Sequence, residues 1–170
     1  MNQLKQENLM RKIMIEKVVL SVGGIADKLE KGHKLLAFLS GMKPLRIMSK
    51  KRIPSLGVRP GLEVGAKVTL RKLKMIELLK RLLEALDRKL KSSQVSENTL
   101  SFGIKEYIEI PGTEYQRDIG IAGLDVTITF ARKGKSIIYK KTGGKLPKKQ
   151  HIPKDEIINF MKDNFKVEFD

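Results

Sequence analysis

The functional side chains that stand out in this sequence are its many lysines and arginines, which bind anions. The 170 residues include 35 Lys and Arg against 19 Asp and Glu, which gives a net charge of +16. Residues 43–74 contain one acid, Glu63, and residues 131–154 contain none, so these two basic segments hold most of the excess. Such blocks repel themselves unless an anion binds them. The distribution favours a polyanionic partner over a merely solubilising surface.

The residue types around these charges favour folded RNA. Aromatic residues make up 5% of the chain and Trp is absent, so a stacking platform for splayed single strands is not expected. No helix-turn-helix, zinc-finger or basic-zipper pattern favours reading of the DNA major groove. Lys, Arg, Ser and Thr suit the phosphates and 2′-hydroxyls of A-form RNA. The alternative is an RNA chaperone or architectural nucleic-acid-binding protein that uses charge alone.

Groups for catalysis or metal binding are few. The chain has no Cys, and His33 and His151 fall on an apolar helical stripe and in a basic tail, so neither a triad nor a His-rich metal site is expected. Five acids lie close in sequence and could act in metal-dependent hydrolysis: Glu106, Glu109, Glu114, Asp118 and Asp125. We expect strand and loop geometry to scatter them. We therefore predict a protein without catalytic residues, metal or cofactor.

Two glycine pairs are weak candidates for anion-binding loops. Gly23-Gly24 stands between a predicted strand and a predicted helix but lacks both phosphate-loop patterns, so we expect a tight turn. The sequence KTGGK at residues 141–145 could form a nest of backbone N–H groups in the basic tail. We interpret the second pair as an RNA contact.

Signals for export and membrane insertion are missing from the sequence. Residues 1–10 have no apolar core of a secretory signal. The longest apolar runs, such as residues 35–39, fall far short of the roughly 18 residues that a membrane span needs. We expect a cytoplasmic protein that makes no contact with a membrane.

Apolar periodicity predicts an α+β fold. Alternation predicts strands at residues 13–22, 44–48, 63–71, 100–107 and 124–131. Spacings of three and four predict helices at 26–39, with Ala26 and Gly41 at its ends, at 73–90, with Leu73 and Ile76 in the core, and at 153–165. The order favours a split βαβ-like, mostly antiparallel sheet with helices on one face, an open opposite face and a long basic loop at 49–61.

One domain of 170 residues is large enough to form a stable hydrophobic core without disulfides. We divide it into a core at 13–131 and a basic tail with a short helix at 132–170. Alternation predicts a small, polar and cationic set of side chains on the open face: Lys17, Ser21, Lys67, Thr69, Arg71 and Lys105.

Several motifs in a fixed order resemble the universal large-subunit ribosomal protein L-five family. They are EKVVLSVGG, LSGMKP, SKKRIPSLGVRPG, GAKVTLR, FGIKEYIEIPG and GIAGLDVTITF, and the resemblance covers residues 13–165. The C-terminal stretch RKGKSIIYKKTGGKLPKKQHIPKDEIINFMKDNF is similar to the archaeal and eukaryotic branch, of which we favour the archaeal.

The resemblance implies a structural constituent of the large (50S) ribosomal subunit that binds 5S rRNA and helps to attach it in the central protuberance. The other partners that it implies are large-subunit rRNA, P-site tRNA, other large-subunit proteins and, through an intersubunit bridge, a small-subunit head protein.

The resemblance also assigns RNA contacts by position. Contacts with rRNA fall on Lys17, Ser21, Met42, Lys43, Lys67, Thr69 and Arg71. Ser21 and Met42 stand where the family more usually has Asn and Gln, so they cannot make the same amide hydrogen bonds. The loop at 48–61 corresponds to the loop that approaches tRNA and carries Lys50, Lys51, Arg52 and Arg59. Further RNA contacts are expected at Lys140, Lys141, Lys145, Lys148 and Lys149.

Overall fold

The protein is an α+β domain in which short helices interrupt a run of antiparallel strands. The structure, a computed structural model, describes residues 10–139, 144–145 and 147–170. The strands are β1 Ile13–Gly23, β2 Leu45–Met48, β3 Glu63–Leu70, β4 Lys89–Leu90, β5 Val95–Ser96, β6 Thr99–Ile104, β7 Leu124–Arg132 and β8 Glu168–Phe169. The helices are α1 Asp27–Ser40, α2 Lys72–Glu84 and α3 Lys154–Phe165.

Six strands form one sheet in the order β2-β3-β1-β7-β6-β5, and all its pairings are antiparallel. The central strand β1 therefore pairs with β3 and with β7, which is more than a hundred residues away in the chain. The short strands β4 and β8 form a separate parallel pair. The predicted fold class is confirmed.

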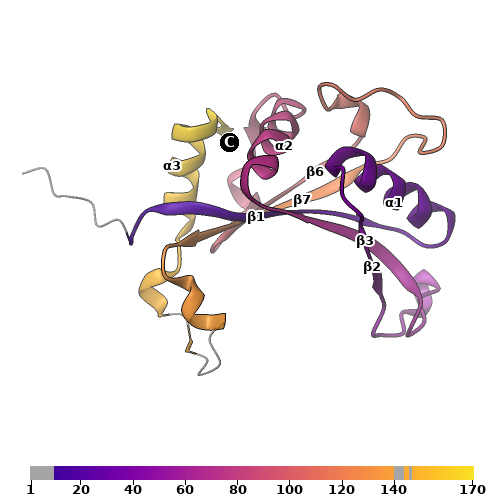
Figure 1. Ribbon diagram of the computed structural model, residues 1–170, viewed down its shortest axis with the longest axis horizontal. Helices are drawn as coiled ribbons and strands as arrows, with labels where there is room; N and C mark the ends of the chain where they lie inside the picture. The colour runs from indigo at the N-terminus through magenta and orange to yellow at the C-terminus, as the bar shows by residue number, and fades with distance from the viewer. Residues whose placement is uncertain (1–9, 140–143, 146) are drawn as a thin grey trace, which may run out of the picture.

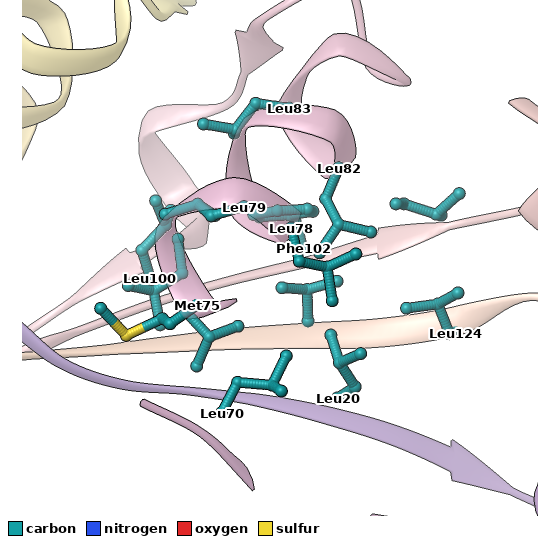
Figure 2. Close-up of a cluster of buried hydrophobic side chains, with 14 of the residues drawn as sticks. Leu20, Leu70, Met75, Leu78, Leu79, Leu82, Leu83, Leu100, Phe102 and Leu124 are labelled. Atoms are coloured by element: carbon teal, nitrogen blue, oxygen red, sulfur yellow. The ribbon is translucent and has the colours of Figure 1, made fainter. Parts of the chain in front are cut away.

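The three helices lie on one side of the sheet (Figure 1). The loop between β2 and β3 and the segment that follows β7 project on the opposite side (Figure 1). Figure 2 shows leucines of α2 packing onto side chains from four strands, among them Leu20, Leu70 and Leu100. These three side chains are at most 1% exposed. Burial of each contributes roughly 1.5–3 kcal/mol, so the sheet and α2 stabilise each other.

The first helix ends where the sequence predicts, but it begins one residue later than predicted. The chain turns after Gly24, whose N–H donates to the Val64 carbonyl over 3.1 Å, and α1 starts at Asp27. The prediction for Ala26 was wrong, because this residue lies in the turn with φ of 51° and is exposed. Gly41 ends the helix as predicted, with φ of 60° and its N–H donating to the Ala37 carbonyl. α1 approaches β1 closely at Gly32, where a Cβ would stand 2.6 Å from Val22 Cγ1.

The predicted core face of the second helix was wrong in its first turns. Leu73 is 75% exposed and Ile76 39% exposed, whereas Met75 and Leu78 are buried. Each pair has a spacing of three residues and is continued by the same leucines later in the helix. Periodicity alone therefore could not decide which pair faces the core. Packing against the sheet selects the stripe that contains Met75 and Leu78. α2 also ends at Glu84 rather than near residue 90, because two residues with positive φ follow: Asp87 and Arg88.

The loop between β6 and β7 also differs from the prediction. β6 ends at Ile104 because the chain enters a 3₁₀ turn at Tyr107–Glu109. The ring of Tyr107 is fully buried, and its hydroxyl accepts a hydrogen bond from the Gln116 N–H over 2.8 Å. The predicted strand to residue 107 therefore ends three residues early. Among the helices of the described residues, none combines the length and the apolar composition that a transmembrane segment requires.

The rotation of α2 gives a stability test. Leu79→Ala should lower the free energy of unfolding by about 3 kcal/mol, because it opens a cavity against the sheet. Leu73→Ala removes the same atoms from an exposed position and should change the free energy of unfolding by less than about 0.5 kcal/mol. Urea denaturation of both variants measures the difference, and equal losses would contradict the observed helix phase.

Candidate nucleic-acid interface

The side of the sheet away from the helices, which we call the open face, presents polar side chains in rows across the strands. In one row Thr69 lies opposite Val19, Val19 opposite Thr127, and Thr127 opposite Ser101. The hydroxyls of Ser101 and Thr127 are 3.2 Å apart. Since neighbouring strands are about 4.8 Å apart, the row spans four strands within roughly 15 Å.

Two further rows flank the first. One crosses five strands, with partners Leu45 on β2, Lys67 on β3, Ser21 on β1, Asp125 on β7 and Gly103 on β6. The other places Lys17, Thr129 and Thr99 in line. The structure thus brings together four of the predicted contact residues: Lys17, Ser21, Lys67 and Thr69.

The rows are mainly polar, with Val19 and the 62% exposed Leu45 as apolar members, and they carry more hydroxyls than the predicted cationic face would have. Lys17 and Lys67 are the cations of the three rows. Arg71 and Lys105 are exposed and lie one residue beyond the ends of β3 and β6. Positive charge therefore gathers at the borders of the open face.

Met42 and Lys43 lie outside the rows, in the connection from α1 to β2. Both are exposed, and the Met42 N–H donates to Ser40 Oγ over 3.2 Å. The connection is fixed by His33, whose Nε2 is 3.3 Å from the Pro44 carbonyl oxygen. His33 thus has a structural role.

The basic loop at 49–61 forms a hairpin that is held by backbone hydrogen bonds. The Ser49 N–H donates to the Leu62 carbonyl over 2.8 Å, and Ile53 and Val58 bridge antiparallel further out. Gly57 makes the tip, with φ of 65° after a 3₁₀ turn at Pro54–Leu56. These bonds hold four exposed cations on a projecting scaffold: Lys50, Lys51, Arg52 and Arg59.

The basic tail leaves the sheet at the end of β7. Lys145 and Lys148 are exposed. Lys149 belongs to a 3₁₀ turn at Lys148–Gln150, but its side chain lies outside what the structure describes, as do Lys140 and Lys141.

A β-bulge in β1 ties this tail to the sheet. The register shifts between Ile15 and Lys17, so Glu16 is the extra residue. Its carboxylate accepts hydrogen bonds from Lys135 Nζ and, over 3.3 Å, from the Tyr139 hydroxyl. Partial burial alone would raise the pKa of Glu16, but the hydrogen bond from Lys135 and the charges of Lys135 and Lys17 outweigh it and lower the pKa below 4.5. Glu16 is therefore ionised at neutral pH.

The acids are scattered as expected. Glu106, Glu109, Glu114 and Asp118 lie along the exposed loop between β6 and β7, and Asp125 stands on the open face. Within the described residues, no three His or acidic side chains come together as a metal site. His151 is held by Asn98, whose Nδ2 donates a hydrogen bond to His151 Nδ1 over 3.1 Å.

The open face predicted from the sequence lacked all residues of β7, and near β6 it contained only Lys105, one residue beyond that strand, and not Thr99 or Ser101. Asp125, Thr127 and Thr129 alternate with buried Val126 and Ile128. The signal was present in the sequence LDVTITF, whose polar residues share one face of a strand.

Known proteins share these elements over nearly the whole chain. Residues 63–160 match the C-terminus of the ribosomal L-five family. The large ribosomal subunit protein uL5 of Sulfolobus acidocaldarius is 40% identical over 171 residues, which cover 98% of this chain and 96% of the relative. The chain belongs to the ribosomal L-five family. The uL5 proteins of Nanoarchaeum equitans (95% of this chain, 98% of the relative) and Methanosphaera stadtmanae (94% and 98%) are both 39% identical to this L-five family chain, in agreement with the expected archaeal branch.

The ionised Glu16 gives a pH test in this L-five family protein. The lowered pKa means that the ion pair with Lys135 stabilises the fold above pH 4.5 and that this contribution is lost as pH falls through the lowered value. Glu16→Gln should therefore cost about 1 kcal/mol of unfolding free energy at pH 7 and almost nothing at the acidic end, since wild-type Glu16 is then protonated too. Urea denaturation of both proteins across this pH range checks it. If Glu16→Gln lowered the free energy of unfolding by the same amount at every pH, the result would contradict a stabilising ion pair between Glu16 and Lys135.

Proposed function

We propose that this L-five family protein binds 5S rRNA with its open face and helps to attach it in the central protuberance of the large ribosomal subunit. The observation that carries the proposal is the set of three aligned polar rows, bordered on the same side of the sheet by a basic loop and a basic tail. The rows offer hydroxyls to RNA sugars and phosphates, and Arg71 and Lys105 add positive charge at the ends of β3 and β6.

Membership of the family makes the chain a structural, non-enzymatic ribosomal protein, and its place is the ribosome in the cytoplasm. The relatives are named as proteins of the large subunit. Ribosomal RNA and other large-subunit proteins are accordingly its partners. The bridge to a small-subunit head protein is a proposal that rests on the resemblance of the sequence motifs.

The proposed mechanism is positional. Lys17, Lys67 and the two cations at the strand ends, Arg71 and Lys105, release counterions as they contact phosphates of 5S rRNA, which supplies affinity. Ser21, Thr69 and the hydroxyls of β6 and β7 stand on a hydrogen-bonded sheet, so their spacing is fixed before RNA binds. No covalent bond is made or broken.

We further propose that the basic loop contacts P-site tRNA. Its backbone bonds and its projection away from the sheet support this role (Figure 1). The exposed Lys145 and Lys148 of the tail are proposed to add contacts with rRNA. Lys140, Lys141 and Lys149 stay predictions from the sequence.

Replacing two open-face residues tests the first proposal. Thr69→Ala with Arg71→Ala should raise the Kd for 5S rRNA at least tenfold, because a hydroxyl contact and a charged contact are together worth about 2 kcal/mol. Filter binding at fixed salt measures it. The matched control, Lys80→Ala with Ser93→Ala, removes one cation and one hydroxyl from exposed sites elsewhere and should change the Kd less than about twofold.

Unchanged affinity of the Thr69 and Arg71 double variant would contradict the proposal. Competition with an arbitrary RNA duplex separates it from the alternative of an RNA chaperone or architectural protein. The proposed function requires a strong preference for 5S rRNA, whereas binding by charge alone gives equal competition.

Neutralising the loop tests the division of surfaces. Changing Lys50, Lys51 and Arg52 to Gln should spare 5S rRNA binding and weaken P-site tRNA retention on reconstituted ribosomes, because these exposed cations stand on the hairpin and not in the rows. The control changes Lys28, Lys31 and Lys34 on α1 to Gln, an equal loss of charge on the helix side. Collapse of 5S rRNA binding in the loop variant alone would show that the surfaces are not separate.

A further inference from the structure

Three carboxylates lie on the strands of the main sheet, and one of them is unpaired. Glu16 binds Lys135, and Glu63 forms an ion pair with Arg46 over 2.7 Å. Asp125 makes no ion pair or side-chain hydrogen bond with any residue that the structure describes. It is exposed on β7 between two buried neighbours, so the strand aims its side chain at the open face.

The neighbours of Asp125 leave its carboxylate accessible. Across β6 the partner is Gly103, where a Cβ would stand 3.3 Å from Asp125 Oδ1. Across β1 the partner is the short Ser21, and Lys67 follows on β3. Two strand spacings put Lys67 about 9–10 Å from Asp125 at the backbone. Both side chains are among those that the structure describes, and no ion pair joins them. Lys67 and Asp125 therefore stand on the two strands that flank Ser21, whose side chain is short.

An unpaired carboxylate is unfavourable on a surface that binds phosphates, because the like charges repel. It becomes favourable where the RNA presents donors, since an ionised carboxylate accepts two strong hydrogen bonds. RNA donors that fit both oxygens at once lie on the Watson–Crick edge of guanine, whose N1–H and N2–H₂ are parallel. Bases in loops and bulges expose this edge, whereas paired bases do not.

We infer that Asp125 recognises an unpaired guanine of the bound RNA, with Lys67 contacting a phosphate next to it. The inference rests on the proposed function and deepens it. The hydroxyl rows fit RNA shape, and Asp125 adds a contact that depends on base identity. The carboxylate then penalises RNA that lacks a guanine at this place, through repulsion that no hydrogen bond offsets.

The opposite effects on two RNAs test the inference. Asp125→Asn should weaken binding to 5S rRNA about tenfold or more and, at the same time, leave unchanged or tighten binding to an arbitrary RNA duplex. Asp118→Asn removes the same charge from the exposed β6–β7 loop and should shift both affinities slightly in the same direction. Melting temperatures of the two variants establish that both are folded.

The base is identified by inosine interference, because inosine lacks the N2 amino group. Inosine incorporated sparsely into 5S rRNA should weaken binding to the wild-type protein at one guanosine position and not weaken binding to the Asp125→Asn variant at that position. Tighter binding of the variant to both RNAs, or identical interference patterns for the two proteins, would overturn the inference. If the Thr69 and Arg71 double variant also binds with full affinity, the proposed function fails as well, and if only that variant loses affinity, it stands without the guanine contact.

Discussion

The pairing of β1 with β3 on one side and β7 on the other is the constraint on which both the core and the open face depend. β1 aligns Val18 and Leu20 under the helices, where both are fully buried, and so aims Lys17 and Ser21 at the opposite side. A slip of one residue would exchange the two sets. The leucines of α2 prevent it, since a slip would bring polar groups against them. The apolar packing in Figure 2 therefore fixes the polar rows on the other face of the sheet.

The bulge at Glu16 marks where this alternation stops and the tail begins. The extra residue lets β1 keep pairing with β7 while its carboxylate reaches Lys135 in the segment beyond β7. The Arg132 guanidinium at the end of β7 also binds Glu156 on α3. Two ion pairs thus anchor the tail, one to β1 through Lys135 and one to the end of β7 through Glu156. One strand accordingly sets the position of the open face and of one of its two basic borders.

The sequence predicted the elements whose period is long enough to be recognised. Alternation over β3 was sufficient to place Lys67 and Thr69 on the correct face, and Gly41 correctly marked the end of α1. β4, β5 and β8 are too short to show a period, and two stripes of α2 overlap, so tertiary contacts chose between them. Asp125 was grouped with acids nearby in sequence, although its strand carries it to another surface. Which residues share a row depends on register between strands distant in the chain, and no local pattern records it.

The open face has charged borders and a hydroxyl-rich centre. This arrangement separates two requirements of RNA binding, which are affinity for phosphates and selectivity for one RNA shape. Long, flexible cations give affinity for any phosphate backbone and depend strongly on salt. Short Thr and Ser side chains on a rigid sheet add little attraction, but they fit only a backbone of matching shape. A face filled with lysines would bind every duplex tightly, and the net charge of +16 would then work against selectivity. With the charge placed on a hairpin and a tail instead, the centre of the sheet can reject RNA that does not match it.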